Sequence, residues 1–435
     1  MTKNDHIPSI RVYISLFAFA LVSMFFSFTF QEPLHVLQGF WRILKCPSQL
    51  LTDYMFVGGI GAAFFNASLM LLLASIALYL SHQKLTGIIV AGLCMVFGFA
   101  FFGKNPFNSL PIVLGICLYA WIEGLDVRTL SSHALFGIAI GPAVSYFCFG
   151  LGLPFWQGFP LSYALGIGIG FILPVLAKNM FKAHGGYTLY NVGFTCGIIG
   201  LFIQGFLRTL GKEVQPVSLI SQGNTAQIAG YLYLMFISMI LLGFIRNRHS
   251  IMNIGQMLCC SGHVPSDFTK MFGYGISFMN MGSLGILFTS FVLVLHLPLN
   301  GPIVGSIFAA VGFGSFGKNL RNVWSIMLGC VLAYSINAED LYTTPAVLSI
   351  LFATNLAPIA GVYGWIAGML AGFFHVSIVQ SMGYLHGGFN LYNNGFTGGF
   401  VAMFLVPLLD ALRHSTFLLS KRIHKLQKTE DIHES

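Results

Sequence analysis

Long apolar stretches separated by short polar connections occupy most of this chain. A helix that crosses a membrane needs about 20 apolar residues, and many of the stretches reach or approach that length. A first series of seven lies at residues 12–31, 57–81, 86–102, 109–125, 134–152, 159–180 and 188–210. A second series of seven lies at residues 226–246, 271–297, 301–316, 323–337, 345–360, 362–382 and 389–411. The pattern predicts an all-α integral membrane protein, in which the shorter segments are half-helices, broken helices or re-entrant hairpins.

Two motifs recur along the chain and divide it into two copies. The 14 residues from His184 recur from His386 with ten identities, and residues 98–105 recur at 312–319 with six identities in eight. The second spacing is 318 − 104 = 214, and further identical residues share it. They are Asp53 and Asp267, Gly59 and Gly273, Gly61 and Gly275, Phe64 and Phe278, Asn66 and Asn280, Asn108 and Asn322, Gly115 and Gly329, Asp126 and Asp340. We therefore predict a first membrane repeat at 1–215, a second at 216–412, and a polar, frayed cytoplasmic tail at 413–435.

Segment number and charge predict how the copies are oriented. Seven segments per copy is an odd number of crossings, so the second copy is expected to be inverted relative to the first. Residues 413–428 hold five basic residues and residues 246–270 hold three, whereas the equivalent first-copy loop at 32–53 holds two. Because cytoplasmic loops carry an excess of Lys and Arg, both termini are expected on the cytoplasmic side of the cell membrane.

Composition excludes several classes of protein. Hydrophobic residues make up 56% of the chain and charged residues 8%, with a mean hydropathy of +0.80, whereas soluble domains are roughly a quarter charged. The net charge of +8 does not indicate nucleic-acid binding, because Lys and Arg fall mostly in loops and at the ends. The eight Cys form no metal-binding spacing, so no metal or other cofactor is expected. The expected partners are the lipid bilayer and a small-molecule solute, and a homo-oligomer is left open.

The motif Phe-Gly-Lys-Asn-x-x-Asn occurs at 102–108 and 316–322. It has a structural interpretation, in which Lys reaches the headgroups and Asn caps the following helix. In the functional interpretation, Lys104 and Lys318 lie at pore depth and attract an anion or bind a carbonyl. Neighbouring asparagines would then supply donors and acceptors to a solute. These are Asn105, Asn108, Asn319 and Asn322.

Two further repeated motifs carry polar side chains. Gly-x-Gly-x-x-Phe-x-Asn at 59–66 and 273–280 has no surrounding βαβ unit, so we interpret it as a bent helix whose Asn lines a path or joins helices. In His-Gly-Gly-[Tyr/Phe]-x-Leu-Tyr-Asn-x-Gly-Phe-Thr, the Gly pair ends one helix, and the N-terminus of the next would favour an anion. His184 and His386 are either proton carriers or structural loop residues.

Six repeated polar groups are predicted to line one polar cavity at mid-membrane, walled by aromatics such as Phe64, Phe278, Tyr190 and Tyr392. Interhelical hydrogen bonding is the alternative role for them. The six are Asn66, Asn191, Thr195, Asn280, Asn393 and Thr397.

The 59–66 motif and the Gly-Lys-Asn turn are similar to elements of the urea transporter family, which has two inverted halves. The chain lacks that family's Leu-Pro-x-x-Thr-x-Pro-Phe signature, of which 153–160 and 354–358 are at best remnants, and Lys104 and Lys318 replace its Tyr. The His-Gly-Gly motifs resemble more closely a prokaryotic membrane family catalogued as a domain of unknown function. That resemblance covers the whole chain and implies a shared architecture.

The sequence thus favours a membrane transporter or channel for a small polar or anionic solute, with its path between two inverted repeats. No catalytic residue is predicted, because a path through both leaflets uses two copies of each polar motif whereas an enzyme seldom needs them. The alternatives are an intramembrane enzyme using His184 or His386 and a non-transporting membrane scaffold.

Overall fold

The computed structural model describes residues 7–215, 217–336 and 340–433, and helices dominate this part of the chain. The first ten α-helices are α1 (Ile7–Ser27), α2 (Pro33–Leu44), α3 (Tyr54–Val57), α4 (Ile60–Leu80), α5 (Gly87–Phe99), α6 (Pro106–Ile122), α7 (Ser131–Gly137), α8 (Gly141–Phe149), α9 (Phe155–His184) and α10 (Asn191–Thr209). The other ten are α11 (Thr225–Arg246), α12 (Ile254–Cys259), α13 (Phe268–Met271), α14 (Gly273–Val294), α15 (Gly301–Gly312), α16 (Leu320–Ile336), α17 (Thr344–Ala353), α18 (Ala357–Tyr363), α19 (Trp365–Leu385) and α20 (Asn393–His433).

Short elements join these helices. The 3-10 turns are η1 (Val127–Leu130), η2 (Ile138–Ile140), η3 (Phe313–Ser315) and η4 (Thr354–Leu356). The strands β1 (Leu51–Thr52) and β2 (Ser218–Leu219) pair in parallel, with Leu51 opposite Ser218. This small sheet ties the loop before α3 to the loop before α11.

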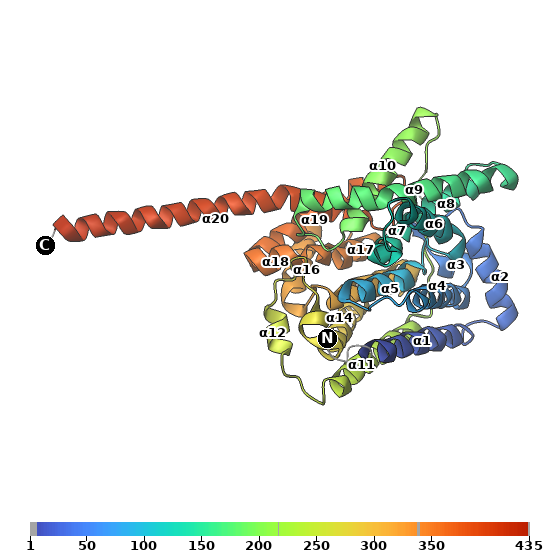
Figure 1. The fold of residues 1–435 in the computed structure, drawn as a ribbon, viewed down its shortest axis with the longest axis horizontal. Coiled ribbons are helices and arrows are strands. Elements are labelled where there is room, and N and C mark those ends of the chain that lie inside the picture. The colour runs from blue at the N-terminus through green and yellow to red at the C-terminus, as the bar shows by residue number, and fades with distance from the viewer. Residues whose placement is uncertain (1–6, 216, 337–339, 434–435) are drawn as a thin grey trace.

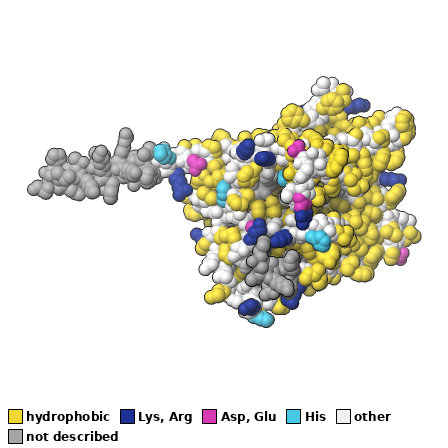
Figure 2. All heavy atoms as spheres, in the orientation of Figure 1, with side chains coloured by type: hydrophobic (Ala, Val, Ile, Leu, Met, Phe, Trp, Pro, Cys, Tyr) yellow, Lys and Arg dark blue, Asp and Glu magenta, His cyan; other side chains and the backbone are white. Residues whose placement is uncertain are grey.

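Ten helical segments of the described residues are long and apolar enough to cross a membrane. Hydrophobic side chains occupy much of the face drawn in Figure 2. Several large ones are well exposed, such as Phe25 (71%), Trp156 (72%) and Phe202 (74%). In water this surface would be unfavourable, whereas lipid solvates it. The fold is therefore that of a multi-pass membrane protein.

Each of the fourteen predicted apolar segments coincides with a helix or with consecutive helices. The tail was expected to be frayed, and this expectation is corrected, because α20 continues as a helix to His433. Residues 413–433 contain no Gly or Pro to end it. Figure 1 shows α20 extending beyond the helical body.

The helices α5 and α15 lie antiparallel in the protein interior. They have 13 and 12 residues, about 20 Å at 1.5 Å per residue, and are shorter than a 30 Å hydrocarbon core. A Cβ on Gly98 would lie 2.5 Å from the Gly305 carbonyl oxygen, and one on Gly305 would lie 2.4 Å from that of Gly98. Gly87 at the start of α5 is likewise against the Ser315 carbonyl. Glycine thus permits direct backbone contact between the two helices.

Candidate functional site

Asn66 and Asn280 satisfy the ends of the two short interior helices. The Asn66 side-chain nitrogen donates to the carbonyls of Lys104 (2.8 Å) and of the residue four positions earlier (2.7 Å). Asn280 makes the same two bonds to the Lys318 carbonyl (2.7 Å) and to the carbonyl four residues before it (2.7 Å). These carbonyls lie just beyond the ends of α5 and α15, in the turns that lead to the two lysines, where the amides supply donors.

The asparagines that follow each Lys are helix caps. The side-chain oxygens of Asn105 and Asn108 each accept from the other's backbone N–H, both at 3.0 Å, in a reciprocal capping box at the start of α6. Asn319 and Asn322 exchange the same bonds (2.8 and 3.0 Å) before α16. The four side chains therefore occupy the positions of the helix-cap interpretation.

Lys104 and Lys318 are fully buried, so neither reaches the headgroups. The Lys318 ammonium donates to the Tyr190 hydroxyl and to the Thr354 hydroxyl, both at 2.8 Å. The Lys104 ammonium has no hydrogen-bond partner among the described residues and lies 5.0 Å from the centre of the Phe99 ring. A lysine charge placed inside a membrane costs at least about 3 kcal/mol, which makes these two buried groups candidates for a functional role.

The two lysine environments differ at a position that binds Lys318 in the second half of the chain. Thr354 corresponds to Ile138, since 354 − 138 = 216 is also the spacing between Pro142 and Pro358. Ile138 has no hydroxyl to accept from Lys104. Tyr392, the equivalent of Tyr190 at a spacing of 392 − 190 = 202, likewise has a buried hydroxyl without a partner.

Aromatic rings join the two lysine environments. The Tyr190 and Tyr392 ring centres are 5.4 Å apart. Tyr190 lies 4.6 Å from Phe313, and Tyr392 lies 4.7 Å from Phe99. Since Lys318 and Lys104 lie over Phe313 and Phe99, the tyrosine contact is the meeting point of the two halves of the site.

The His-Gly-Gly turns hold their histidines by both ring nitrogens. His184 Nδ1 accepts from the Gly186 N–H (3.2 Å), so Nε2 carries the proton and donates to the Asn191 side-chain oxygen at 2.9 Å. His386 is held in the same way by the Asn390 N–H (3.4 Å) and the Asn393 side chain (2.9 Å). The glycines after each His have φ between +59° and +80°, which ends the helix as predicted.

The remaining polar groups of this motif bind backbone carbonyls. The Asn191 and Asn393 side-chain nitrogens donate to the Ala177 (3.1 Å) and Val379 (3.3 Å) carbonyls. Thr195 and Thr397 hydroxyls each donate to the carbonyl four residues earlier, at 3.0 Å. The two Asn bonds are interhelical, as in the alternative role, whereas the two Thr bonds lie within α10 and α20.

A cavity of about 130 Å³ lies at the N-terminus of α10. Of the six groups predicted to share one cavity, Asn191 lines this one. Of the four aromatic walls, Tyr190 and Tyr392 line it, whereas Phe64 packs against Phe101 and Tyr231. Its lining also includes His133 and Thr188, which the sequence did not single out.

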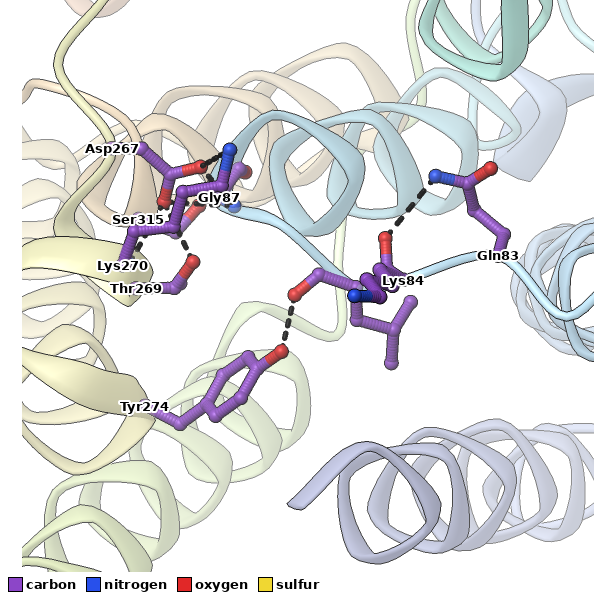
Figure 3. A network of polar contacts seen from close by, with 9 residues as sticks. Gln83, Lys84, Gly87, Asp267, Thr269, Lys270, Tyr274 and Ser315 are labelled. Carbon is purple, nitrogen blue, oxygen red and sulfur yellow. Dashed lines mark hydrogen bonds and ion pairs between the residues drawn. The ribbon is translucent and has the colours of Figure 1, made fainter. Parts of the chain in front are cut away.

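Asp267 binds the N-terminus of α5 from the other half of the chain (Figure 3). Its carboxylate accepts from the Gly87 N–H at 3.1 and 3.2 Å and from the Thr269 hydroxyl at 2.6 Å. The equivalent Asp53 accepts from the Ser221 N–H (2.9 Å) and hydroxyl (2.6 Å) and hydrogen-bonds the Gly301 backbone at the start of α15. Each short helix therefore has an acidic group at its positive end.

Sequence reasoning treated Asp53 and Asp267 only as a repeated pair, because their partners are far away in sequence. Asp126 and Asp340 were expected in interfacial loops, and both are exposed. Hydrogen bonds from Arg128 hold the pKa of Asp126 below its ordinary value. This is a local loop contact away from the buried lysines.

Comparison with known proteins identifies the family. The model of the family described as "Protein of unknown function (DUF1576)" matches residues 32–209 and 246–411. The two matched segments begin 246 − 32 = 214 residues apart. No curated protein and no solved structure matches the chain, and a urea transporter relationship does not emerge. Because the matched segments cover most of the sequence, the chain belongs to the DUF1576 family.

Proposed function

We propose that this protein is a transporter or channel for a small anionic solute, whose path lies between two inverted repeats. Support for the inversion comes from reciprocal contacts. Asp267 of the second copy binds the start of α5 in the first, and Asp53 of the first binds the start of α15 in the second. Such exchange of equivalent contacts is typical of a two-fold axis. Because α5 and α15 are antiparallel, that axis would lie in the membrane plane.

The proposed orientation places both termini in the cytoplasm. Helix α1 begins where α11 ends, since the Arg246 guanidinium donates to the Arg11 carbonyl at 3.0 Å. The Tyr13 hydroxyl in turn donates to the Gln83 carbonyl in the loop before α5 (2.9 Å). This end of the molecule also carries Lys270, next to Asp267. Its basic character favours the cytoplasmic side.

The observation that best supports the transport proposal is the pair of buried lysines on either side of the Tyr190–Tyr392 contact. Ionisable groups inside membrane proteins generally face a solute path or a charged partner. No carboxylate forms an ion pair with Lys104 or Lys318 in the described chain. The Lys104 ammonium has three N–H donors and no hydrogen-bond partner, which suits a solute that is negatively charged and accepts hydrogen bonds.

The intramembrane-enzyme alternative is not favoured by the histidine geometry. A general base needs a free nitrogen lone pair within reach of a substrate. In His184 and His386, Nδ1 accepts from a backbone N–H and Nε2 donates to an Asn. These bonds suit residues that fix a turn. We therefore assign both histidines a structural role within this proposal.

Flux measurements test the proposal. Protein in liposomes is assayed with chloride, nitrate and the neutral solute urea, and anion flux is expected to exceed urea flux. Lys104→Met and Lys318→Met should each lower anion flux by tenfold or more, which is about 1.4 kcal/mol of barrier. Lys→Arg at either position should also impair anion flux, because the planar guanidinium of Arg does not replace a compact ammonium group.

The exposed Lys212 supplies the matched control, since Lys212→Met removes a charge outside the buried site. It is expected to leave flux unchanged. Anion flux that survives in both folded Lys→Met variants would overturn the proposal. Complete absence of flux, together with tight binding to another membrane protein, would favour a scaffold instead.

A further inference from the structure

The cavity beside α10 has the dimensions of a site for a small solute. At about 130 Å³ it has room for several waters or one solute of a few heavy atoms, since liquid water occupies about 30 Å³ per molecule. Its walls come from both halves of the chain, with Tyr190 and Phe136 from the first and Phe313 and Tyr392 from the second. It reaches the tyrosine contact between the buried lysines.

One wall of this cavity is the first turn of α10, residues 191–193. The first N–H groups of a helix have no acceptor within it, and the helix dipole is positive there. Helix α10 has 19 residues, so its dipole is well developed. Such a helix end attracts an anion or a carbonyl oxygen.

A second, independent observation is the unpartnered hydroxyl of Tyr392. This residue lines the cavity, is 1% exposed, and its hydroxyl has no hydrogen-bond partner. Tyr190, across from it, uses its hydroxyl oxygen to accept from Lys318, so its own proton is directed to another acceptor. Both tyrosines line the cavity, and Lys318, which is not part of the lining, binds the Tyr190 hydroxyl from behind it.

The cavity lining contains no Asp or Glu. His133 also lines it, and its Nδ1 has no hydrogen-bond partner. The cavity is therefore a small space with mostly aromatic and aliphatic walls, a helix N-terminus, few polar side chains and no acidic group. A ligand there must accept hydrogen bonds, carry negative charge and contain few atoms.

We infer that this cavity binds one small inorganic anion, such as nitrate or chloride, between the first turn of α10 and the hydroxyls of Tyr190 and Tyr392. The inference rests on the proposed function and narrows its solute class. The anion accepts from the α10 backbone and from both phenols. Lys318 contributes its charge through Tyr190, as a positioning residue behind the wall.

Equilibrium binding tests the site separately from flux. Purified protein in detergent is heated in sodium nitrate or in sodium gluconate at matched ionic strength, and the unfolding midpoint is followed by circular dichroism. A ligand that binds only the folded state raises its stability with concentration. Nitrate should raise the midpoint in a saturable way, whereas gluconate is too large for the cavity and should not.

Tyr392→Phe is the informative variant because it removes a hydroxyl that makes no bond within the protein. It should remain folded and weaken apparent nitrate affinity at least fivefold. Tyr119→Phe on α6, outside the cavity lining, is the matched control and should bind nitrate like the wild type. Ser132→Phe, which places a ring at the cavity lining, should also weaken nitrate binding.

Equal nitrate affinity in the wild type and Tyr392→Phe, or equal stabilisation by gluconate, would overturn the inference. Nitrate binding that depends on Tyr392 in a protein without flux would keep the site and remove the transport proposal. Anion flux without saturable nitrate binding would keep the transport proposal and remove the binding site.

Discussion

The lysine environments lead to a paired prediction with a different outcome in each half of the chain. Thr354→Val removes the hydroxyl that accepts from Lys318 and keeps the side-chain shape. Ile138→Thr introduces a hydroxyl at the position that matches Thr354 by sequence spacing, in the half of the chain whose Lys104 ammonium has no partner. Thr354→Val therefore removes a hydrogen bond from the buried Lys318 ammonium, whereas Ile138→Thr provides a possible hydrogen-bond acceptor for Lys104.

The magnitudes follow from these bonds. A hydrogen bond to a charged group is worth about 1.5–3 kcal/mol, but side-chain bonds measured inside membrane proteins reach only about 1.7 kcal/mol. Thr354→Val should therefore lower the free energy of unfolding by about 1–2 kcal/mol. For Ile138→Thr, a similar gain offsets the lost burial of about one or two carbon groups at about 0.8 kcal/mol each, so the net change should be near zero.

Equilibrium unfolding in mixed detergent micelles, followed by far-ultraviolet circular dichroism, measures both changes. Thr289→Val is the matched control, because Thr289 is buried and its hydroxyl has no partner. It should cost less than Thr354→Val. The reasoning fails if Thr354→Val costs no more than Thr289→Val, or if Ile138→Thr destabilises as strongly as Thr354→Val.

Three further substitutions test the interior helices, each by its thermal unfolding midpoint. Asn280→Leu should lower the free energy of unfolding by about 2–6 kcal/mol, because two buried carbonyls each lose a donor worth about 1–3 kcal/mol. The control is Ser68→Ala, which removes a hydroxyl without a partner. An equal cost of the two substitutions would contradict this reasoning. Asp267→Ala should cost about 1–2 kcal/mol through the lost cap on α5, and an unchanged midpoint would exclude that role. Gly305→Ala should destabilise by about 1–3 kcal/mol, because its methyl would lie 2.4 Å from the Gly98 carbonyl, and a stabilised protein would show that the helices can separate.

The membrane helices could be predicted from the sequence because length and hydrophobicity suffice to define them. The short helices α2, α3, α12 and α13 were not predicted, since they have 4–12 residues and lie between the long apolar runs. The helix breaks at Gly185 and Gly387 were predicted, because the Gly pairs provide a local signal. Local spacing thus identifies elements and their ends well.

The candidate site was less predictable because its contacts join distant parts of the chain. The sequence singled out Lys104 and Lys318 but left their depth open, since burial depends on packing by other helices. The role of Thr354 in binding Lys318 depends on a fold that brings them together. A signal was present all the same, because Thr stands where the first copy has Ile138.

The hydrogen bonds of α5 also set an order for biogenesis. The Gly87 N–H is completed by Asp267, 180 residues later in the chain, and the Gly87 carbonyl accepts from Ser315, 228 residues later. When α5 first leaves the ribosome, both of these partners are still unsynthesised. These two bonds can therefore form only after α13 and α15 have been synthesised. A chain truncated before residue 267 would leave the N-terminus of α5 without the carboxylate that caps it.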